Sequence, residues 1–151
     1  MPDTKLANTI CYEELISDES EDFHWPEFDE NTASSLCYTS GTTGNPKGVL
    51  YSHRSTILHA WIVSSGNVAK VSSSSCILPV VPMFHVNAWG IPYAGAMFGA
   101  KLVFPGPSLD GASIYELIDN EKPDLLMGVP TVWLGLLQHL RETNQTLDCV
   151  E

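Results

Sequence analysis

The run Tyr38-Thr-Ser-Gly-Thr-Thr-Gly-Asn-Pro-Lys-Gly48 combines three glycines, four Ser/Thr hydroxyls and one lysine between apolar neighbours. Glycine adopts positive φ freely and lets backbone amides approach a ligand closely. Successive amides in such a turn form a concave site for anions, and Lys47 adds a mobile positive charge. The stretch therefore predicts a loop that binds a polyphosphate, with hydroxyls available as further donors or as a metal contact.

This loop is not a Walker A motif. That motif needs glycine before the lysine and Ser or Thr after it, whereas Pro46 precedes Lys47 and Gly48 follows it. The pattern instead resembles the signature of the adenylate-forming superfamily, which includes acyl-CoA synthetases, firefly-type luciferases and peptide-synthetase adenylation domains. The resemblance implies that the loop binds ATP. The residues expected to contact its phosphates are Thr39, Ser40, Gly41, Thr42, Thr43, Gly44 and Lys47.

A second motif, Pro82-Met-Phe-His-Val-Asn-Ala-Trp-Gly90, follows an apolar strand-like run. It resembles the family's Pro-x-Phe-His-x-x-Gly-like segment, which lies on the acyl side of the nucleotide site. The resemblance implies that His85 positions the substrate carboxylate and that Val86 and Trp89 border the adenylate and the acyl chain. The tryptophan matches the variant of medium- to long-chain fatty acyl-CoA synthetases. Judged from the residues alone, a lone histidine such as His85 is more often structural than functional, although its place directly after a strand and before a polar-aromatic turn favours a site. Trp89 is equally a core aromatic.

A third segment, Gly128-Val-Pro-Thr131, resembles the part of the family's chain that lines the acyl pocket, where Gly128 would leave room for substrate. Without the resemblance it is only the end of a strand followed by the start of a helix. His53, His59 and His139 show no metal-ligand spacing and are expected to be structural.

Short apolar runs alternate with longer helical patterns from Ala33 onward. We expect strands at 36–39, 49–52, 76–81, 101–104 and 124–128, and helices at 53–67, 88–98, 113–120 and 131–142. Ser52 is the expected N-cap of the first helix, and Trp133 is expected on the apolar face of the last. This alternation predicts an α/β fold with a mostly parallel sheet and helices on both faces. Such sheets bind ligands beyond the carboxyl ends of their strands, so the three motifs are expected to converge on one cleft.

Composition divides the chain unevenly. Nine of the 18 acidic residues lie between Glu13 and Glu30, and no Lys or Arg lies between Lys5 and Lys47. We interpret residues 1–32 as an acidic surface or linker segment and residues 33–151 as a partial AMP-binding (adenylation) domain. The absence of a basic face argues against a nucleic-acid partner.

The four cysteines are widely spaced and favour reduced thiols and a cytoplasmic location over a disulfide framework or a zinc site. No apolar run is long enough to span a bilayer, so membrane contact is expected to be peripheral at most. A homodimer of the full-length protein is left open.

The resemblance implies an ATP-dependent ligase that converts a medium- or long-chain fatty acid to an acyl-adenylate and then transfers it to coenzyme A. Lys47 and His85 would be its catalytic residues, and Thr39 would contact Mg²⁺. Adenylation is a reaction between two anions, so positioning and charge stabilisation are what the protein can supply.

The family's later motifs do not occur in these 151 residues. We therefore expect an interior piece of a longer ligase, with little activity and a tendency to aggregate when isolated. An aryl or short-chain acyl-CoA ligase and a non-catalytic nucleotide-binding module of the same fold remain alternatives. Amino-acid adenylation is disfavoured because no aspartate occurs in 82–90 or 128–133. A serine hydrolase is excluded because no G-x-S-x-G elbow is present.

Overall fold

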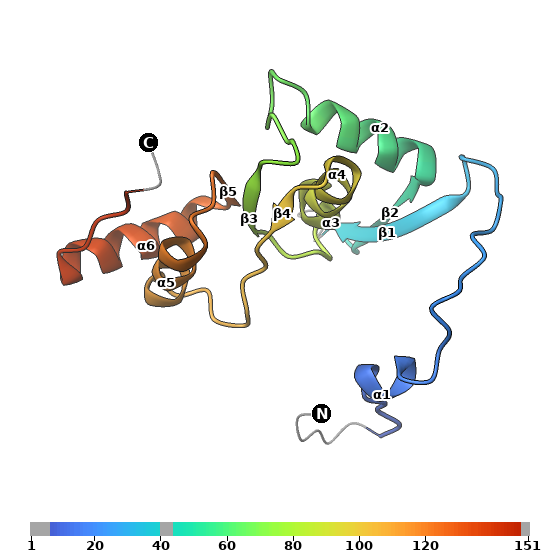
Figure 1. Ribbon diagram of the computed structural model, residues 1–151, viewed down its shortest axis with the longest axis horizontal. Helices are drawn as coiled ribbons and strands as arrows, with labels where there is room; N and C mark the ends of the chain where they lie inside the picture. The colour runs from blue at the N-terminus through green and yellow to red at the C-terminus, as the bar shows by residue number, and fades with distance from the viewer. Residues whose placement is uncertain (1–6, 40–43, 149–151) are drawn as a thin grey trace.

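The computed structural model describes residues 7–39 and 44–148, whose strands form two separate sheets (Figure 1). The strands are β1 (Ala33–Thr39), β2 (Lys47–Ser52), β3 (Cys76–Val80), β4 (Lys101–Leu102) and β5 (Leu125–Gly128). The helices are α1 (Tyr12–Ile16), α2 (His53–Val63), α3 (Val86–Trp89), α4 (Ile91–Phe98), α5 (Gly111–Glu121) and α6 (Pro130–Thr143). The fold is α/β, as the alternation of patterns predicts.

The larger sheet is parallel and has the order β4-β3-β5. Its central strand β3 is almost entirely buried, which suits its apolar sequence. Leu78 packs on one face with Ile114 and Ile118 of α5, while Ile77 packs on the other with Ile91 of α4. Fully burying each of these side chains contributes about 1.5–3 kcal/mol. Helices therefore cover both faces, as predicted, with α5 and α6 on one side of the sheet and α4 on the other (Figure 1).

Pro79 lies in the middle of this central strand, a position where proline usually removes a ladder hydrogen bond. In a parallel strand, successive residues bond to opposite neighbours. The carbonyl of Ile77 accepts from Val103 on the β4 side, at 2.8 Å, whereas that of Cys76 accepts from Asp124 on the β5 side, at 2.9 Å. The nitrogen of Pro79 therefore faces the β4 side, where β4 has already ended. No hydrogen bond between β3 and β4 is therefore lost because proline lacks an N–H.

The first two strands do not join this sheet, which corrects the expectation that the phosphate-loop strand shares its carboxyl edge. β1 and β2 pair antiparallel as a hairpin, from Ala33↔Ser52 to Thr39↔Lys47. The physical reason is the short connection between Thr39 and Lys47, because a parallel crossover needs a dozen or more residues. Only β3 and β5 bring their motifs to one edge, where Val80 pairs with Gly128.

Several element boundaries also differ from the sequence prediction. The helix expected at 53–67 ends at Val63, and the strand expected at 101–104 ends at Leu102. The helix expected at 88–98 is divided at Gly90 into α3 and α4, with Pro92 in the first turn of α4. α1 was not predicted, because its five residues bury nothing and carry no apolar period.

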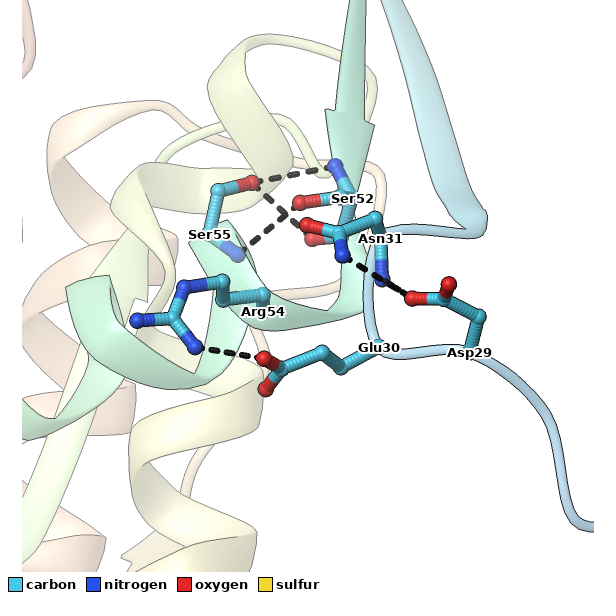
Figure 2. Close-up of polar contacts among 6 residues, drawn as sticks. All are labelled: Asp29, Glu30, Asn31, Ser52, Arg54 and Ser55. Carbon is cyan, nitrogen blue, oxygen red and sulfur yellow. Dashed lines mark hydrogen bonds and ion pairs between the residues drawn. The ribbon is translucent and has the colours of Figure 1, made fainter.

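The acidic segment ends in contacts with the start of α2 (Figure 2). Ser52 caps this helix, as predicted, and forms a reciprocal capping box with Ser55. The backbone amide of Arg54 donates to the carbonyl of Glu30 at 2.8 Å, and the two side chains form an exposed ion pair. A carboxylate beside a helix N-terminus is also favoured by the helix dipole. The segment is therefore held against α2 where it enters the hairpin.

Close helix contact at Gly111 yields a stability prediction. A Cβ at this position would overlap the carbonyl oxygen of Gly135 and lie 2.7 Å from the Cβ of His139. Gly111→Ala should force α5 and α6 apart and destabilise this part of the protein by about 1–3 kcal/mol. Amide hydrogen exchange of the α5 and α6 peptides in the full-length protein measures this opening. The matched control is Gly135→Ala, where a Cβ meets nothing within 4 Å and alanine should slow exchange by its higher helix propensity. Faster exchange in both variants would contradict the assignment of the close contact to Gly111.

The N-cap of α5 yields a prediction of pH dependence. The side chain of Asp110 accepts from the amides of Ala112 and Ser113 at 3.1 Å and from the Ser113 hydroxyl at 2.8 Å. The amide of Ser113 first, and then its hydroxyl, lower the pKa of Asp110 from its ordinary value of 3.8. Folding thus favours the charged form, and its contribution is present above the unfolded pKa and lost as pH falls through the folded pKa. Asp110→Ala should lower the thermal midpoint by roughly 2 °C at pH 7. Asp110→Asn, which keeps a capping oxygen, should recover most of this loss. The difference in thermal midpoint between wild type and Asp110→Asn should shrink as pH falls. A difference that grew as pH fell below 3.8 would contradict a lowered pKa for Asp110.

Candidate active site

The loop end of the β1–β2 hairpin, here called the hairpin base, holds two of the predicted nucleotide-binding residues opposite each other. Thr39 and Lys47 form the last pair of the β1–β2 ladder, and the hydroxyl of Thr39 donates to the carbonyl oxygen of Lys47 at 3.4 Å. Directly opposed residues project from the same face of an antiparallel pair. Both side chains are exposed. The hydroxyl and the ammonium are therefore presented together where the loop begins.

Four of the predicted loop residues, Ser40, Gly41, Thr42 and Thr43, lie outside the described residues. The other predicted loop glycine, Gly44, is exposed, and a Cβ there would meet nothing within 4 Å. Gly48 is different, because a Cβ would approach the Leu36 side chain to 3.0 Å. Packing against Leu36 thus explains why glycine is needed at position 48, whereas Gly44 stands in open space that a ligand can enter.

Alternation along β1 shows which face of the hairpin carries these groups. Side chains at every second position of a strand share a face, so Thr39 lies on the face of Cys37 and Ser35. Cys37 is buried, with 6% of its surface exposed, and both it and Ser35 contact Asn87 of α3. The face that presents Thr39 and Lys47 is therefore the face that packs on the second motif.

His85 stands at the entrance to an unusual backbone segment. Its amide donates to the carbonyl of Pro82 at 3.0 Å, which closes a turn after β3, and its side chain is exposed. The next five residues all have positive φ: Val86 50°, Asn87 50°, Ala88 49°, Trp89 57° and Gly90 75°. Left-handed backbone costs L-residues about 1–2 kcal/mol each, and a β-branched valine there is rare. Strain of this kind persists only where surrounding contacts hold it.

Contacts from two other elements hold the left-handed turn. The side chain of Asn87 donates from Nδ2 to Ser35 Oγ at 2.8 Å and accepts from the Cys37 thiol at 3.3 Å. From α2, His59 Nε2 lies 3.1 Å from the carbonyl oxygen of Trp89. The His59 ring also fills the space beside Gly90, where a Cβ would lie 2.5 Å from it. His59 therefore supports the end of the turn.

A pocket of about 240 Å³ lies between the end of β2, the start of α2 and the left-handed turn. Its lining residues are Tyr51, Ser55, Thr56, His59, Val86, Asn87, Gly90 and Tyr93. The pocket includes Val86, which was predicted to border the ligand, but neither Lys47 nor Gly128. Within the described residues the hairpin thus contacts the second motif, and the third motif lies beside the end of β3. This pocket does not join all three motifs in the one cleft that the sequence predicts.

Gly128 ends β5 beside the end of β3, and its neighbour in space is Trp133 of α6. The Trp133 indole donates to the carbonyl of Gly128 at 3.1 Å, and a Cβ on Gly128 would lie 2.7 Å from the indole ring. The space beside this glycine is thus occupied by an indole of the same chain. Sequence reasoning placed Trp133 in the apolar face of a helix and did not anticipate this contact.

The donor set fits a magnesium ion that is carried by nucleotide phosphates. Among residues 7–39 and 44–148, no group of three or more His, Cys, Asp or Glu side chains can hold a metal ion. The Thr39 hydroxyl is a hard oxygen ligand, and Mg²⁺ commonly keeps water and phosphate oxygens as its remaining ligands. The Thr39 hydroxyl at the hairpin base therefore suits one ligand position of an ion that arrives with the nucleotide.

A sequence profile described as "AMP-binding enzyme" matches residues 3–149. The chain belongs to this AMP-binding enzyme family. The match also covers the acidic segment, in which the motifs quoted above do not occur.

Curated relatives of the family include coenzyme A ligases for different acids. The chain is 59% identical over 133 residues to a medium-chain-fatty-acid–CoA ligase of Ectopseudomonas oleovorans, covering 88% of this chain and 24% of the relative. It is 57% identical over 140 residues to a 3-methylmercaptopropionyl-CoA ligase of Ruegeria lacuscaerulensis, covering 93% of this chain and 26% of the relative. The chain thus spans about a quarter of the length of these curated relatives.

A solved structure shows the same fold. The inhibitor-bound N-terminal domain of FACL13 from Mycobacterium tuberculosis superposes with a TM-score of 0.75 at 30% identity, covering 90% of this chain and 33% of that one. The observed architecture is therefore that of part of an acyl-CoA synthetase N-terminal domain.

Proposed function

We propose that the full-length protein containing this chain activates a fatty carboxylic acid with ATP and transfers the acyl group to coenzyme A. The observation that carries the proposal is the hairpin face. It presents Thr39 and Lys47 and packs, through Ser35 and Cys37, on the turn that follows His85. Candidate phosphate-binding groups and a candidate carboxylate-binding group are thereby joined in one unit. Membership of the AMP-binding enzyme family supports the same chemistry.

In the first half-reaction, a carboxylate oxygen forms a bond to the α-phosphorus of ATP, and the bond from that phosphorus to the bridging oxygen breaks. Pyrophosphate leaves with the electron pair. Lys47, together with the loop amides, would bind the β- and γ-phosphates and offset the charge that grows on pyrophosphate. His85 would orient the carboxylate against the α-phosphorus. The Thr39 hydroxyl would hold Mg²⁺, which would supply further neutralisation of phosphate charge.

In the second half-reaction, the sulfur of coenzyme A attacks the carbonyl carbon of the acyl-adenylate. The carbon–oxygen bond to AMP breaks, AMP leaves with the electron pair, and the thiol proton passes to solvent. Val86 and Trp89 would border the adenylate and the acyl chain, and Gly128 would lie at the edge of the acyl pocket. The carbonyl of Trp89 lies against His59, so the position of this wall depends on α2.

Fatty-acid-dependent exchange of radiolabelled pyrophosphate into ATP tests the proposal on the full-length protein. Exchange that requires both a medium- or long-chain acid and Mg²⁺, followed by thioester formation on addition of coenzyme A, is the expected result. Absence of exchange with every acid offered would overturn the ligase proposal and favour a nucleotide-binding module. The isolated 151-residue chain should support little exchange.

A small-acid ligase is the second candidate. Its support is the 57% identity to the 3-methylmercaptopropionyl-CoA ligase, close to the 59% shared with the medium-chain ligase. A panel from propionate and 3-(methylthio)propionate to decanoate and palmitate separates the two, with kcat/KM as the readout. The highest kcat/KM should fall on an acid of medium or greater length. A preference for the short acids would establish the second candidate instead.

No helix within the described residues has the length and hydrophobicity needed to cross a bilayer. The cytoplasmic location, the peripheral membrane contact and the homodimer remain predictions.

A further inference from the structure

Asn87, in the left-handed turn 86–89, reaches the hairpin with its side chain through two hydrogen bonds. Its amide nitrogen donates to Ser35 Oγ at 2.8 Å, and its amide oxygen accepts from Cys37 Sγ at 3.3 Å. Ser35 and Cys37 are separated from Asn87 by about 50 positions in the chain. These bonds therefore connect two segments whose relative position the local sequence does not determine.

The two segments carry opposite halves of the proposed site. Cys37 lies two residues before Thr39 on the same face of β1, and Thr39 pairs with Lys47. Asn87 lies two residues after His85, within a backbone that left-handed φ values make unfavourable without outside support. A shift of the turn relative to the hairpin would move His85 relative to Lys47, although neither residue would lose a direct contact.

Asparagine suits both demands of this position. It tolerates the left-handed conformation better than most residues with a side chain, and its amide offers a donor and an acceptor side by side, which suits two partners on one face of β1. Ser35 and Asn87 are half-buried and Cys37 is buried, so water competes poorly for these bonds. The nearby pocket of about 240 Å³ includes Asn87 in its wall, and its shape therefore depends on the same side chain.

We propose that Asn87 is a positioning residue that fixes the His85 segment against the phosphate-binding hairpin during adenylation. Its kinetic consequence rests on the proposed function. Adenylation requires the carboxylate and the departing pyrophosphate to be aligned, so it needs both segments in register. Thioester formation from a supplied acyl-adenylate has no pyrophosphate to hold. Loss of Asn87 should therefore slow the first half-reaction far more than the second, which uses the wall formed by Val86 and Trp89 but does not need that wall in register with Lys47.

Asn87→Gly in the full-length protein is the principal variant, because glycine keeps the left-handed backbone and removes only the side chain. Its adenylation kcat should fall about 30-fold, with thioester formation from supplied acyl-adenylate changed by no more than about twofold. Ser35→Ala, which removes one of the two bonds, should show a smaller loss in the same step. In the double variant the two losses should not multiply.

Asn144→Gly is the matched control. Asn144 also has a left-handed backbone, with φ of 54°, but it caps α6 away from the hairpin. The same substitution there should leave both half-reactions at wild-type rates. A general effect of losing an asparagine from left-handed backbone would reduce the rates of both variants alike.

Thiol labelling gives a readout that does not depend on catalysis. In the wild type, buried Cys37 should react slowly with a maleimide, and Asn87→Gly should raise its rate about tenfold as the hairpin separates from the turn. Cys76, at the amino end of β3, should keep its rate and serves as the internal reference in peptide mapping. Labelling can be measured even if the wild type shows no acid-dependent exchange. Absence of exchange would refute the proposed function but would leave the docking of the turn by Asn87 open to this test.

The proposal stands if adenylation slows, thioester formation is retained and Cys37 becomes reactive. Equal loss of both half-reactions would show a purely structural role and overturn it. Unchanged Cys37 labelling would also overturn it, because the hairpin would then be docked without Asn87. If Asn87→Gly does not fold, the same three measurements on Ser35→Ala decide between these outcomes.

Discussion

Lys47→Ala in the full-length protein should lower the rate of adenylation by about 100- to 1000-fold, the loss typical when one preorganised group that stabilises transition-state charge is removed. Lys47 is exposed at the hairpin base, opposite Thr39, so its removal should not disturb the core. Thioester formation from supplied acyl-adenylate should change little, because pyrophosphate has already left. Single-turnover measurements of the two half-reactions provide the test.

Lys101→Ala is the matched control for this charge. Lys101 is also an exposed lysine on a strand, but it pairs with Cys76 at the amino end of β3, away from the sheet edge that carries the motifs. It should leave adenylation at the wild-type rate. Equal adenylation rates for wild type and Lys47→Ala would remove Lys47 from the mechanism and favour a module that only binds nucleotide.

His85→Ala should lower kcat/KM for the carboxylic acid by about 10- to 100-fold, because an unoriented carboxylate seldom reaches the α-phosphorus in line. The KM for ATP should stay within about twofold, since His85 is assigned to the acid and not to the phosphates. Initial rates at varied acid and at varied ATP separate these two effects. His85→Gln, which keeps a hydrogen-bonding group, should recover part of the loss.

His139→Ala is the control for losing a histidine. The His139 ring lies 5.6 Å from that of Tyr115, between α5 and α6, and has no assigned part in substrate binding. Its kinetic parameters should match those of wild type. If His85→Ala instead raised the KM for ATP and spared the acid, the assignment of the second motif to the acyl side would be wrong.

The sequence predicted the parallel sheet well because local patterns and burial agree there. The apolar run of β3 can be buried on both faces only between helices, and the apolar faces of α5 and α6 pack on one of them. Ser52 was predicted correctly as an N-cap because the capping box is entirely local. The hairpin was misassigned because periodicity shows a strand but not its partner. The connection between Thr39 and Lys47 is too short for a parallel crossover, so its length could have predicted the antiparallel pairing.

The left-handed turn could not have been predicted from local sequence. Val86, Ala88 and Trp89 favour right-handed backbone, and only Asn87 and Gly90 hinted at positive φ. The conformation depends on Ser35, Cys37 and His59, which are distant in sequence. Sequence-based predictions are expected to fail at such strained positions. The contacts of Asn87 and His59 accordingly appear only in the folded chain.

A crystal structure of the full-length protein with Mg²⁺ and a nonhydrolysable ATP analogue tests the central claim most directly. The account predicts that the β- and γ-phosphates lie at the hairpin base, within hydrogen-bonding distance of the Lys47 ammonium and of amides between Thr39 and Gly48. His85 should face the α-phosphate from the opposite side. Phosphates bound elsewhere, with the hairpin making no contact to them, would contradict it.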